Sequence, residues 1–172
     1  MLATLGMATD SVFSLVMPES YVVLPFMYTD TPKREKEKLA VAERELDRII
    51  KDVTERRKGL DRTRRGPLPW VLTHVFGAVF CRWMITDKPF SVDTDRCTAC
   101  GRCVQVCPMY NISRGEGGRP VWGRSGGCTA CLACYHHCPR HAINYGPLTH
   151  RRGQYYYGHP VLSTNQSKES KL

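Results

Sequence analysis

The sequence predicts an α+β protein in which a small cysteine-rich domain of short hairpins and helices follows a strand and a long helix. Three observations lead to this fold class. Eight of the nine cysteines lie between Cys97 and Cys138, in two copies of one spaced run. Apolar residues recur at helical spacing within residues 31–58, and a short apolar run from Val12 to Val16 precedes them.

The charge balance and the cysteine usage restrict the possible functions. The 172 residues carry a net charge of +9, which favours anionic partners. Residues 33–65 hold 13 Lys/Arg against 8 Asp/Glu, so about half of the excess lies there. The N-terminal segment has no basic region and Asp10 interrupts its apolar run, so we expect no signal peptide and a cytoplasmic protein. Clustered cysteines in an intracellular chain indicate metal rather than disulfides.

The chain divides into four parts. These are a strand and a long helix (1–58), a basic linker with an apolar helix (59–86), a cysteine domain (87–160) and a polar tail expected to be disordered (161–172). The run Val12–Val16 is expected to form a buried strand. Asp30 or Thr31 can cap the long helix, and Pro32 suits its first turn. Gly59 is expected to end it.

The apolar stretch from Leu68 to Ile85 raises the question of a membrane. It is at the lower limit of length for spanning a bilayer and contains His74 and Arg82, so an integral membrane segment is not expected. We expect a buried or interfacial helix, with contact to a membrane surface as an alternative because arginines precede it. Cys81, the ninth cysteine, is expected to be a buried free thiol. The basic linker has no aromatic residues interleaved with it, so nucleic acid is not an expected partner.

Two stretches repeat one cysteine spacing. Cys97–Pro108 and Cys128–Pro139 both read C-x2-C-x2-C-x3-C-P, with a period of 31 residues. Three closely spaced thiolates cannot comfortably surround one zinc ion, but they suit three corners of an iron–sulfur cube. The spacing is the bacterial ferredoxin pattern, in which the fourth cysteine ligates the other cluster. We therefore expect two [4Fe-4S] clusters, with zinc as the alternative.

Each cluster is expected to take its fourth ligand from the other copy, because the helical turn after the third cysteine carries the chain away from its own cube. Cluster I then has the ligands Cys97, Cys100, Cys103 and Cys138, and cluster II has the ligands Cys128, Cys131, Cys134 and Cys107. Ile112 and Ile143 are expected to pack against the cubes, and Trp122 to cover one of them. Tyr110 and Tyr145 follow the two runs at similar distances and are expected to be packing residues rather than electron relays. Each oxidised cube is anionic, so part of the local basic excess is expected to be its counter-charge.

From about Met17 onward the chain resembles a family of two-domain proteins, in which a flavodoxin-like domain precedes a two-cluster ferredoxin domain. The resemblance lies in "MPESYV", the long charged helix, "KPFSVDTDRC", the two cysteine runs, "NI…GRPVW" and "QYYYGHP". It implies that residues 11–58 are the last strand and helix of a flavodoxin-like domain. Met1 lies only 16 residues before Met17, so most of that domain is expected to be missing. Its phosphate-binding loop would be missing too, and FMN is therefore not an expected cofactor.

These observations favour an electron carrier that is not itself an enzyme, since the chain has no nucleophile motif or acid–base pair. The alternative is an electron-transfer component of a larger flavin-dependent oxidoreductase, with a redox partner chain such as a flavoprotein. The exposed apolar faces expected on residues 11–58 would need such a chain or a membrane surface. A basic binding module with a structural metal is the third and least favoured hypothesis.

Overall fold

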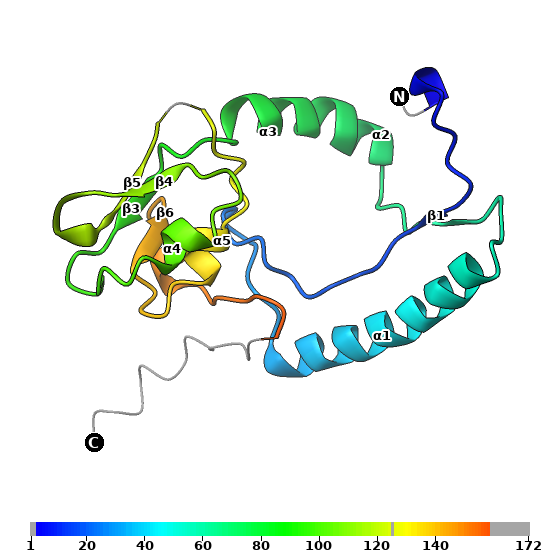
Figure 1. Cartoon of the computed structure of the whole chain (residues 1–172), viewed down its shortest axis with the longest axis horizontal. Coiled ribbons are helices and arrows are strands. Elements are labelled where there is room, and N and C mark those ends of the chain that lie inside the picture. Colours follow the sequence, from blue (N-terminus) through cyan, green and yellow to red (C-terminus); the bar gives the residue numbers. More distant parts are fainter. Residues whose placement is uncertain (1–2, 125, 159–172) are drawn as a thin grey trace.

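The computed structural model describes residues 3–124 and 126–158 (Figure 1). The predicted disordered tail, 161–172, lies outside this range. The helices are α1 (Pro32–Thr54), α2 (Pro69–Val71), the π-helical turn η2 (Leu72–Phe76), α3 (Gly77–Trp83), α4 (Arg102–Gln105) and α5 (Ala133–His136). The strands are β1 (Val12–Phe13), β2 (Asp61–Arg62), β3 (Phe90–Val92), β4 (Ile112–Arg114), β5 (Pro120–Trp122) and β6 (Ile143–Tyr145). This mixture of helices and small sheets agrees with the predicted α+β class.

The cysteine domain is built from two structurally equivalent copies. Adding the sequence period of 31 to the bounds of α4 gives α5, and adding it to the bounds of β4 gives β6. Each copy contributes one strand to a two-stranded antiparallel sheet. β4 pairs with β5, opposing Ile112 to Trp122, and β6 pairs with β3, opposing Ile143 to Val92. The repeated cysteine runs therefore lie on repeated structure.

Aromatic side chains hold the two sheets together. The Phe90 ring stacks on Trp122 with centroids 5.2 Å apart and meets Tyr145 edge-on at 4.8 Å. All three side chains are buried, together with Ile112 and Ile143. Burial of a large apolar side chain contributes about 1.5–3 kcal/mol, and each aromatic pair adds about 0.5–1.5 kcal/mol. The domain thus has its own core.

Residues 20–28 are tied to the end of the cysteine domain by a buried arginine. The Arg152 guanidinium donates to the carbonyl oxygens of Val22 (3.0 Å), Leu24, Pro25 (2.8 Å) and Met27. Val22 itself is fully buried in the core. Because a buried carbonyl without a partner is costly, one side chain fixes the path of this segment.

Helix α1 forms where the sequence predicts it. The backbone N–H of Arg34 donates to the Thr31 hydroxyl at 3.4 Å, which caps the first turn, and Pro32 is the first helical residue. The helix ends at Thr54, and Gly59 adopts a left-handed conformation beyond it. The prediction of this helix is therefore confirmed, with an earlier end.

The predicted buried strand is wrong. β1 has only two residues, pairs in parallel with β2, and leaves Val12, Leu15 and Val16 exposed. The apolar face of α1 is also open, since Ile50 is 54% exposed. A two-stranded sheet offers too little surface to cover either element, and the flavodoxin-like half is not shown by this structure.

Helices α2, η2 and α3 follow one another as an arm with large exposed apolar side chains, including Trp70, Phe76 and Trp83. In Figure 1 this arm and α1 both extend away from the cysteine domain.

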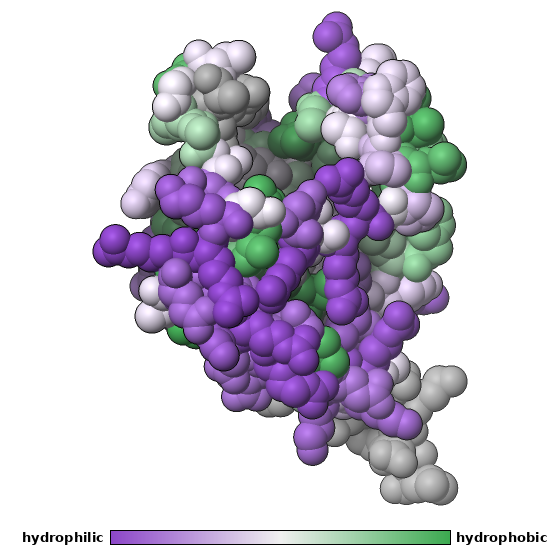
Figure 2. Space-filling view, turned by 90° about the vertical axis from the view of Figure 1, so that its right-hand side faces the viewer, coloured by the Kyte–Doolittle hydropathy of each residue, from purple (hydrophilic) through white to green (hydrophobic). Residues whose placement is uncertain are grey.

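Cys81 is exposed, so the predicted buried thiol is wrong, as is burial of the helix. Among the described residues, no helix is long and apolar enough to span a bilayer. Figure 2 faces the end of the molecule that lies away from the cysteine domain. Hydrophilic side chains cover much of this face, and apolar side chains gather beside them along its upper part.

Replacing Arg152 with Met is expected to release residues 20–28 from the cysteine domain. Four carbonyl oxygens lose the guanidinium, and although Leu24 keeps the Met27 N–H and Pro25 is open to water, each buried group left unsatisfied costs about 1–3 kcal/mol. Amide hydrogen exchange in this segment should therefore quicken at least about tenfold. Arg151→Met, at an exposed neighbouring position, is the control. Equal exchange in the two variants would show that the guanidinium does not hold the segment.

Candidate metal centre

The eight cysteines of the two runs surround two separate cavities. The first is lined by Cys97, Cys100, Cys103 and Cys138, and the second by Cys107, Cys128, Cys131 and Cys134. The cavities are similar in size, at about 20 Å³ each. Each therefore brings together three cysteines of one copy and the fourth cysteine of the other.

Repeated backbone turns produce this arrangement. Ala99 and Ala130 lie between the first and second cysteines of their copies and have φ of 54° and 50°. Gly101 and Leu132, which precede α4 and α5, have φ of 77° and 61°. Left-handed conformations are unfavourable for residues with a side chain, so their recurrence in both copies indicates a chain wrapped tightly around a fixed centre.

Backbone N–H groups donate to cysteine sulfurs in both copies. The N–H of Asn111 lies 3.4 Å from Cys107 Sγ, and the equivalent N–H of Ala142 lies 3.3 Å from Cys138 Sγ. Ala130 donates to Cys128 Sγ at 3.4 Å. Such bonds stabilise negative charge on sulfur and help to set the reduction potential of an iron–sulfur centre.

The environment of the cysteines disfavours their ionised, thiolate form when no cation is present. Burial raises the pKa of the Cys134 thiol above its ordinary value, and the nearby Cys131 and Cys128 thiols raise it further. Burial likewise raises the pKa of Cys103 and of Cys128. Four thiolates can share such a cavity only with a cationic centre among them, so metal binding would release their protons.

The donor set fits an iron–sulfur cluster. Each cavity presents four thiols, apolar walls and N–H donors to sulfur, which is the ligand chemistry such clusters use. Within residues 3–124 and 126–158, no three His, Cys, Asp or Glu side chains are arranged to hold a single metal ion.

The apolar residues predicted around the cysteines lie where expected, with one exception. Ile143 lines the first cavity, and Ile112 and Trp122 line the second, all three being buried. Tyr145 is buried, and its hydroxyl donates to the Met84 carbonyl at 2.9 Å. Tyr110 is 91% exposed, so the prediction that it packs is wrong. With the period of 31, its counterpart is His141, not Tyr145.

Arg114 is a site residue that the sequence reasoning missed. Its guanidinium lies 3.5 Å from the carbonyl oxygens of Ala99 and Cys100, against the loop that carries two cysteines of the first cavity. Gly101 makes room for it, since a Cβ there would lie 2.0 Å from an Arg114 nitrogen. Aligning the two copies could have found the difference, because Tyr145 stands where Arg114 would be repeated.

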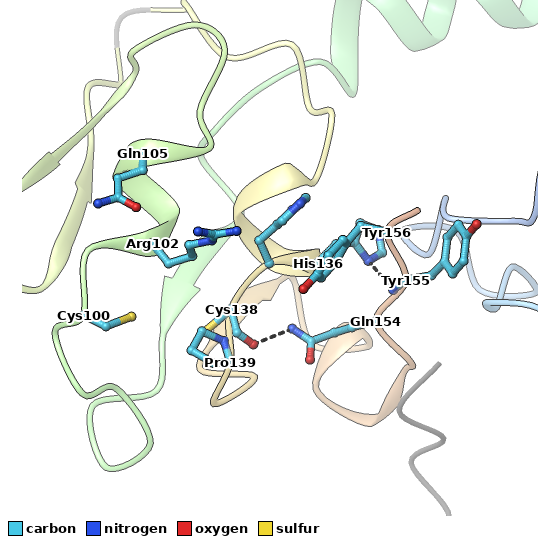
Figure 3. A pocket seen from close by; sticks show the side chains of 10 residues that line it. Cys100, Arg102, Gln105, His136, Cys138, Pro139, Gln154, Tyr155 and Tyr156 are labelled. Carbon is cyan, nitrogen blue, oxygen red and sulfur yellow. Dashed lines mark hydrogen bonds between the residues drawn. The ribbon is translucent and has the colours of Figure 1, made fainter. Parts of the chain in front are cut away.

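A larger cavity of about 410 Å³ opens beside the first set of cysteines (Figure 3). Its lining residues come from both copies and from the segment after η4 (Thr149–Arg151), and they are Cys100, Arg102, Gln105, His136, His137, Cys138, Pro139, Gln154, Tyr155 and Tyr156. The His136 ring is used structurally, with Nε2 donating to the Ser20 carbonyl and Nδ1 accepting from the Tyr155 N–H. Burial lowers the pKa of His136 to about 4, so this ring is neutral.

Residues 90–146 match the family model of the 4Fe-4S dicluster domain. This match supports a ferredoxin-type domain with cluster-binding cysteines, in agreement with the chemistry of the two cavities. No curated protein and no solved structure gave a significant match to the chain.

Gly101→Ala is expected to destabilise the first cavity more than its backbone strain alone would. Gly101 and Gly126 have nearly equal φ, 77° and 79°, but a Cβ at Gly126 meets nothing within 4 Å. A left-handed alanine costs about 1–2 kcal/mol, and displacing the Arg114 guanidinium adds about 1 kcal/mol. The Tm of the metal-loaded protein should therefore fall further for Gly101→Ala than for Gly126→Ala.

Adding Arg114→Ala to Gly101→Ala separates the two contributions. The double variant has no guanidinium to displace. Arg114→Ala should therefore lower the Tm less in the Gly101→Ala background than in the wild type. Strict additivity of the two changes in Tm would mean that the glycine and the arginine act independently.

Proposed function

We propose that the protein carries single electrons through two [4Fe-4S] clusters, one in each thiol-lined cavity. The observation that carries this proposal is the exchange of the fourth cysteine, which gives each cavity four sulfur donors. Cluster I would be held by Cys97, Cys100, Cys103 and Cys138, and cluster II by Cys128, Cys131, Cys134 and Cys107. The match to the dicluster domain supports iron–sulfur electron transfer.

The chain's own residues bind, shield and tune the clusters. The clusters supply the electron-accepting chemistry. The thiolates fix them, and N–H donors such as those of Asn111 and Ala142 stabilise the sulfur charge. Ile112 and Ile143 keep water from the cavity walls. No chemical step on a substrate is assigned to this chain.

Anaerobic reconstitution with iron and sulfide tests the proposal. Two cubes require about eight iron atoms per chain. The reconstituted protein should show broad visible absorbance that bleaches on reduction with dithionite. Zinc in place of iron, with no bleaching, would contradict electron transfer and leave a structural metal.

Cys107→Ala is expected to disturb cluster II, although Cys107 lies in the first run. It lines the cavity with Cys128, Cys131 and Cys134, so that cavity would keep three of its four thiols. EPR of the dithionite-reduced protein should show an altered or lost signal from the cluster that those three cysteines hold. Cys81→Ala, at the exposed ninth cysteine, is the control.

Assigning the affected signal requires a second variant. Cys128→Ala should remove the same EPR signal as Cys107→Ala, because the proposal places both residues on one cluster. If Cys107→Ala instead matched Cys97→Ala, the fourth ligand would belong to its own run.

A second candidate is an electron-transfer component of a larger flavin-dependent oxidoreductase. The arm of α2, η2 and α3 and the apolar face of α1 are exposed, and large uncovered apolar surfaces usually mark interaction sites. A redox partner chain, such as a flavoprotein, would cover them in the cytoplasm. In this proposal residues 11–58 are the remnant of a flavodoxin-like domain, and FMN would belong to the partner. Contact of the arm with a membrane surface is the competing explanation for its exposed side chains.

Replacing Trp70, Phe76 and Trp83 together with Ser should abolish capture of this partner. These side chains are exposed, so the change should leave the cysteine domain folded. In anaerobic pull-downs, the wild type should retain a chain with flavin absorbance and the variant should not. Tyr110→Ser, at another exposed aromatic, is the control. Vesicle binding by the wild type, with no retained flavin, would favour the membrane surface instead.

A further inference from the structure

The two copies carry different charges at equivalent positions. Three arginines lie on the side of the first cavity, and their counterparts 31 residues away are uncharged, the pairs being Arg102 with Ala133, Arg114 with Tyr145 and Arg140 with Met109. Arg102 and Arg140 line the first cavity, whereas Ala133 and Met109 line the second. The repeat thus supplies an internal comparison in which backbone and ligands are alike and the charge differs.

The second cavity instead has a buried carboxylate nearby. Asp87 is 2% exposed and accepts from the Asn111 side chain at 2.8 Å and from the Arg124 N–H at 2.9 Å. Asn111 itself lines the second cavity, so this hydrogen bond places the carboxyl group next to the cavity wall. The Arg124 guanidinium donates to backbone carbonyl oxygens of Asp87, Lys88 and Phe90.

This difference in charge favours reduction of the cluster in the first cavity over reduction of the cluster in the second. Reduction of a cluster adds one negative charge, which nearby cations stabilise. At the second side the Asp87 carboxyl group is accompanied by the Arg124 guanidinium, so the arginines around the first cavity are the main difference. Arg114 is held against the cysteine loop itself, and Arg102 and Arg140 line the cavity. The cluster held by Cys97, Cys100, Cys103 and Cys138 should therefore be reduced before its partner.

The 410 Å³ cavity gives that same side a docking pocket. It is bordered by Cys100 and Cys138, both from the first set, so an occupant would lie directly against the cluster ligands. Figure 3 shows the Arg102 side chain at the pocket beside α5. Among the described residues, the Arg102 guanidinium has no hydrogen-bond or ion-pair partner, so it is available to an occupant.

The walls of the pocket suit a flat molecule. The His137 and Tyr156 rings both line the pocket and stack on each other with centroids 4.0 Å apart and planes 16° from parallel, so an occupant can meet the outer face or the edge of this aromatic pair. The Gln154 amide donates to the Cys138 carbonyl at 2.9 Å, which ties the wall to the cysteine run. The volume lies in the range of small-molecule sites, about 300–1,000 Å³. A free guanidinium selects anionic groups on such a molecule.

We propose that the protein exchanges electrons through the first cluster with a small, planar, anionic redox molecule bound in this pocket beside Arg102. The inference rests on the proposed function. It adds the place where electrons enter or leave the protein and the class of the redox partner. For a quinone acceptor the reaction balances when two reduced clusters each lose one electron. The quinone takes these two electrons and two protons from the buffer to become the hydroquinone.

Stopped-flow oxidation of the fully reduced protein tests the proposal with two planar dyes of opposite charge. Anthraquinone disulfonate is an anion, and methylene blue is a cation. With the wild type, the rate with the anion should saturate as its concentration rises, because it binds before electrons move. Arg102→Ala should raise the half-saturation concentration for the anion about tenfold, the loss of one charge-assisted contact. The rate with methylene blue should not fall.

Arg102→Ala places at this position the residue that its structural counterpart, Ala133, already has, so the helical turn can accept it. Arg44→Ala, at an exposed position on α1, removes the same charge elsewhere and is the matched control. If both variants raised the half-saturation concentration equally, the effect would come from the net charge of the protein, and binding in the pocket would be refuted. A rate linear in the anion, or one unchanged by Arg102→Ala, would also overturn it.

Iron content and dithionite bleaching of each variant keep this result separate from the proposed function. A protein without clusters would fail at that step and refute electron transfer itself. A variant with both clusters intact and unaltered kinetics would refute only electron exchange through the pocket beside Arg102. EPR during stepwise reduction adds a further readout, since the signal lost in Cys97→Ala should be the first to appear in the wild type.

Discussion

Four thiols gathered around one small cavity can remain together as thiolates only if positive charge lies among them. Burial and mutual repulsion both raise the pKa of Cys134, so without a cationic centre its proton would stay on sulfur. The surrounding structure follows from this requirement. The left-handed turns at Ala99 and Ala130 wrap the chain around the cavities, and N–H donors such as Ala142 point at sulfur. The aromatic core around Phe90 then holds the two copies against each other.

Sequence reasoning succeeded where a short pattern determines the local structure. The cysteine spacing indicated the repeat, and the repeat placed α4 and α5, and likewise β4 and β6, 31 residues apart. The cap at Thr31 and the start of α1 at Pro32 also follow from local chemistry. Burial could not be predicted in the same way. The apolar runs at Val12–Val16 and around Cys81 look like core, but their burial depends on surfaces that the described residues do not provide.

The sequence indicated which cysteines line each cavity, but it gave much less of what surrounds them. Cys97 and Cys128 belong to a spacing that carries its own chemistry, whereas Arg102 and Arg114 belong to no motif. Their importance comes from comparing each with the residue at the equivalent place in the other copy. The period of 31 pairs Tyr110 with His141 and not with Tyr145, so the burial of Tyr145 says nothing of Tyr110. The register of a repeat therefore carries information about function that its motif does not.

The crossing of the fourth cysteine has a consequence for how such a domain could arise. One copy alone would bring three of the four sulfurs to its cavity, and its remaining cysteine would point towards a neighbour. An ancestral single copy would therefore have completed its centres only as a symmetric pair of identical chains. Gene fusion would have turned that pair into one polypeptide. Arginines could then accumulate on one side alone, a divergence that two identical chains cannot achieve.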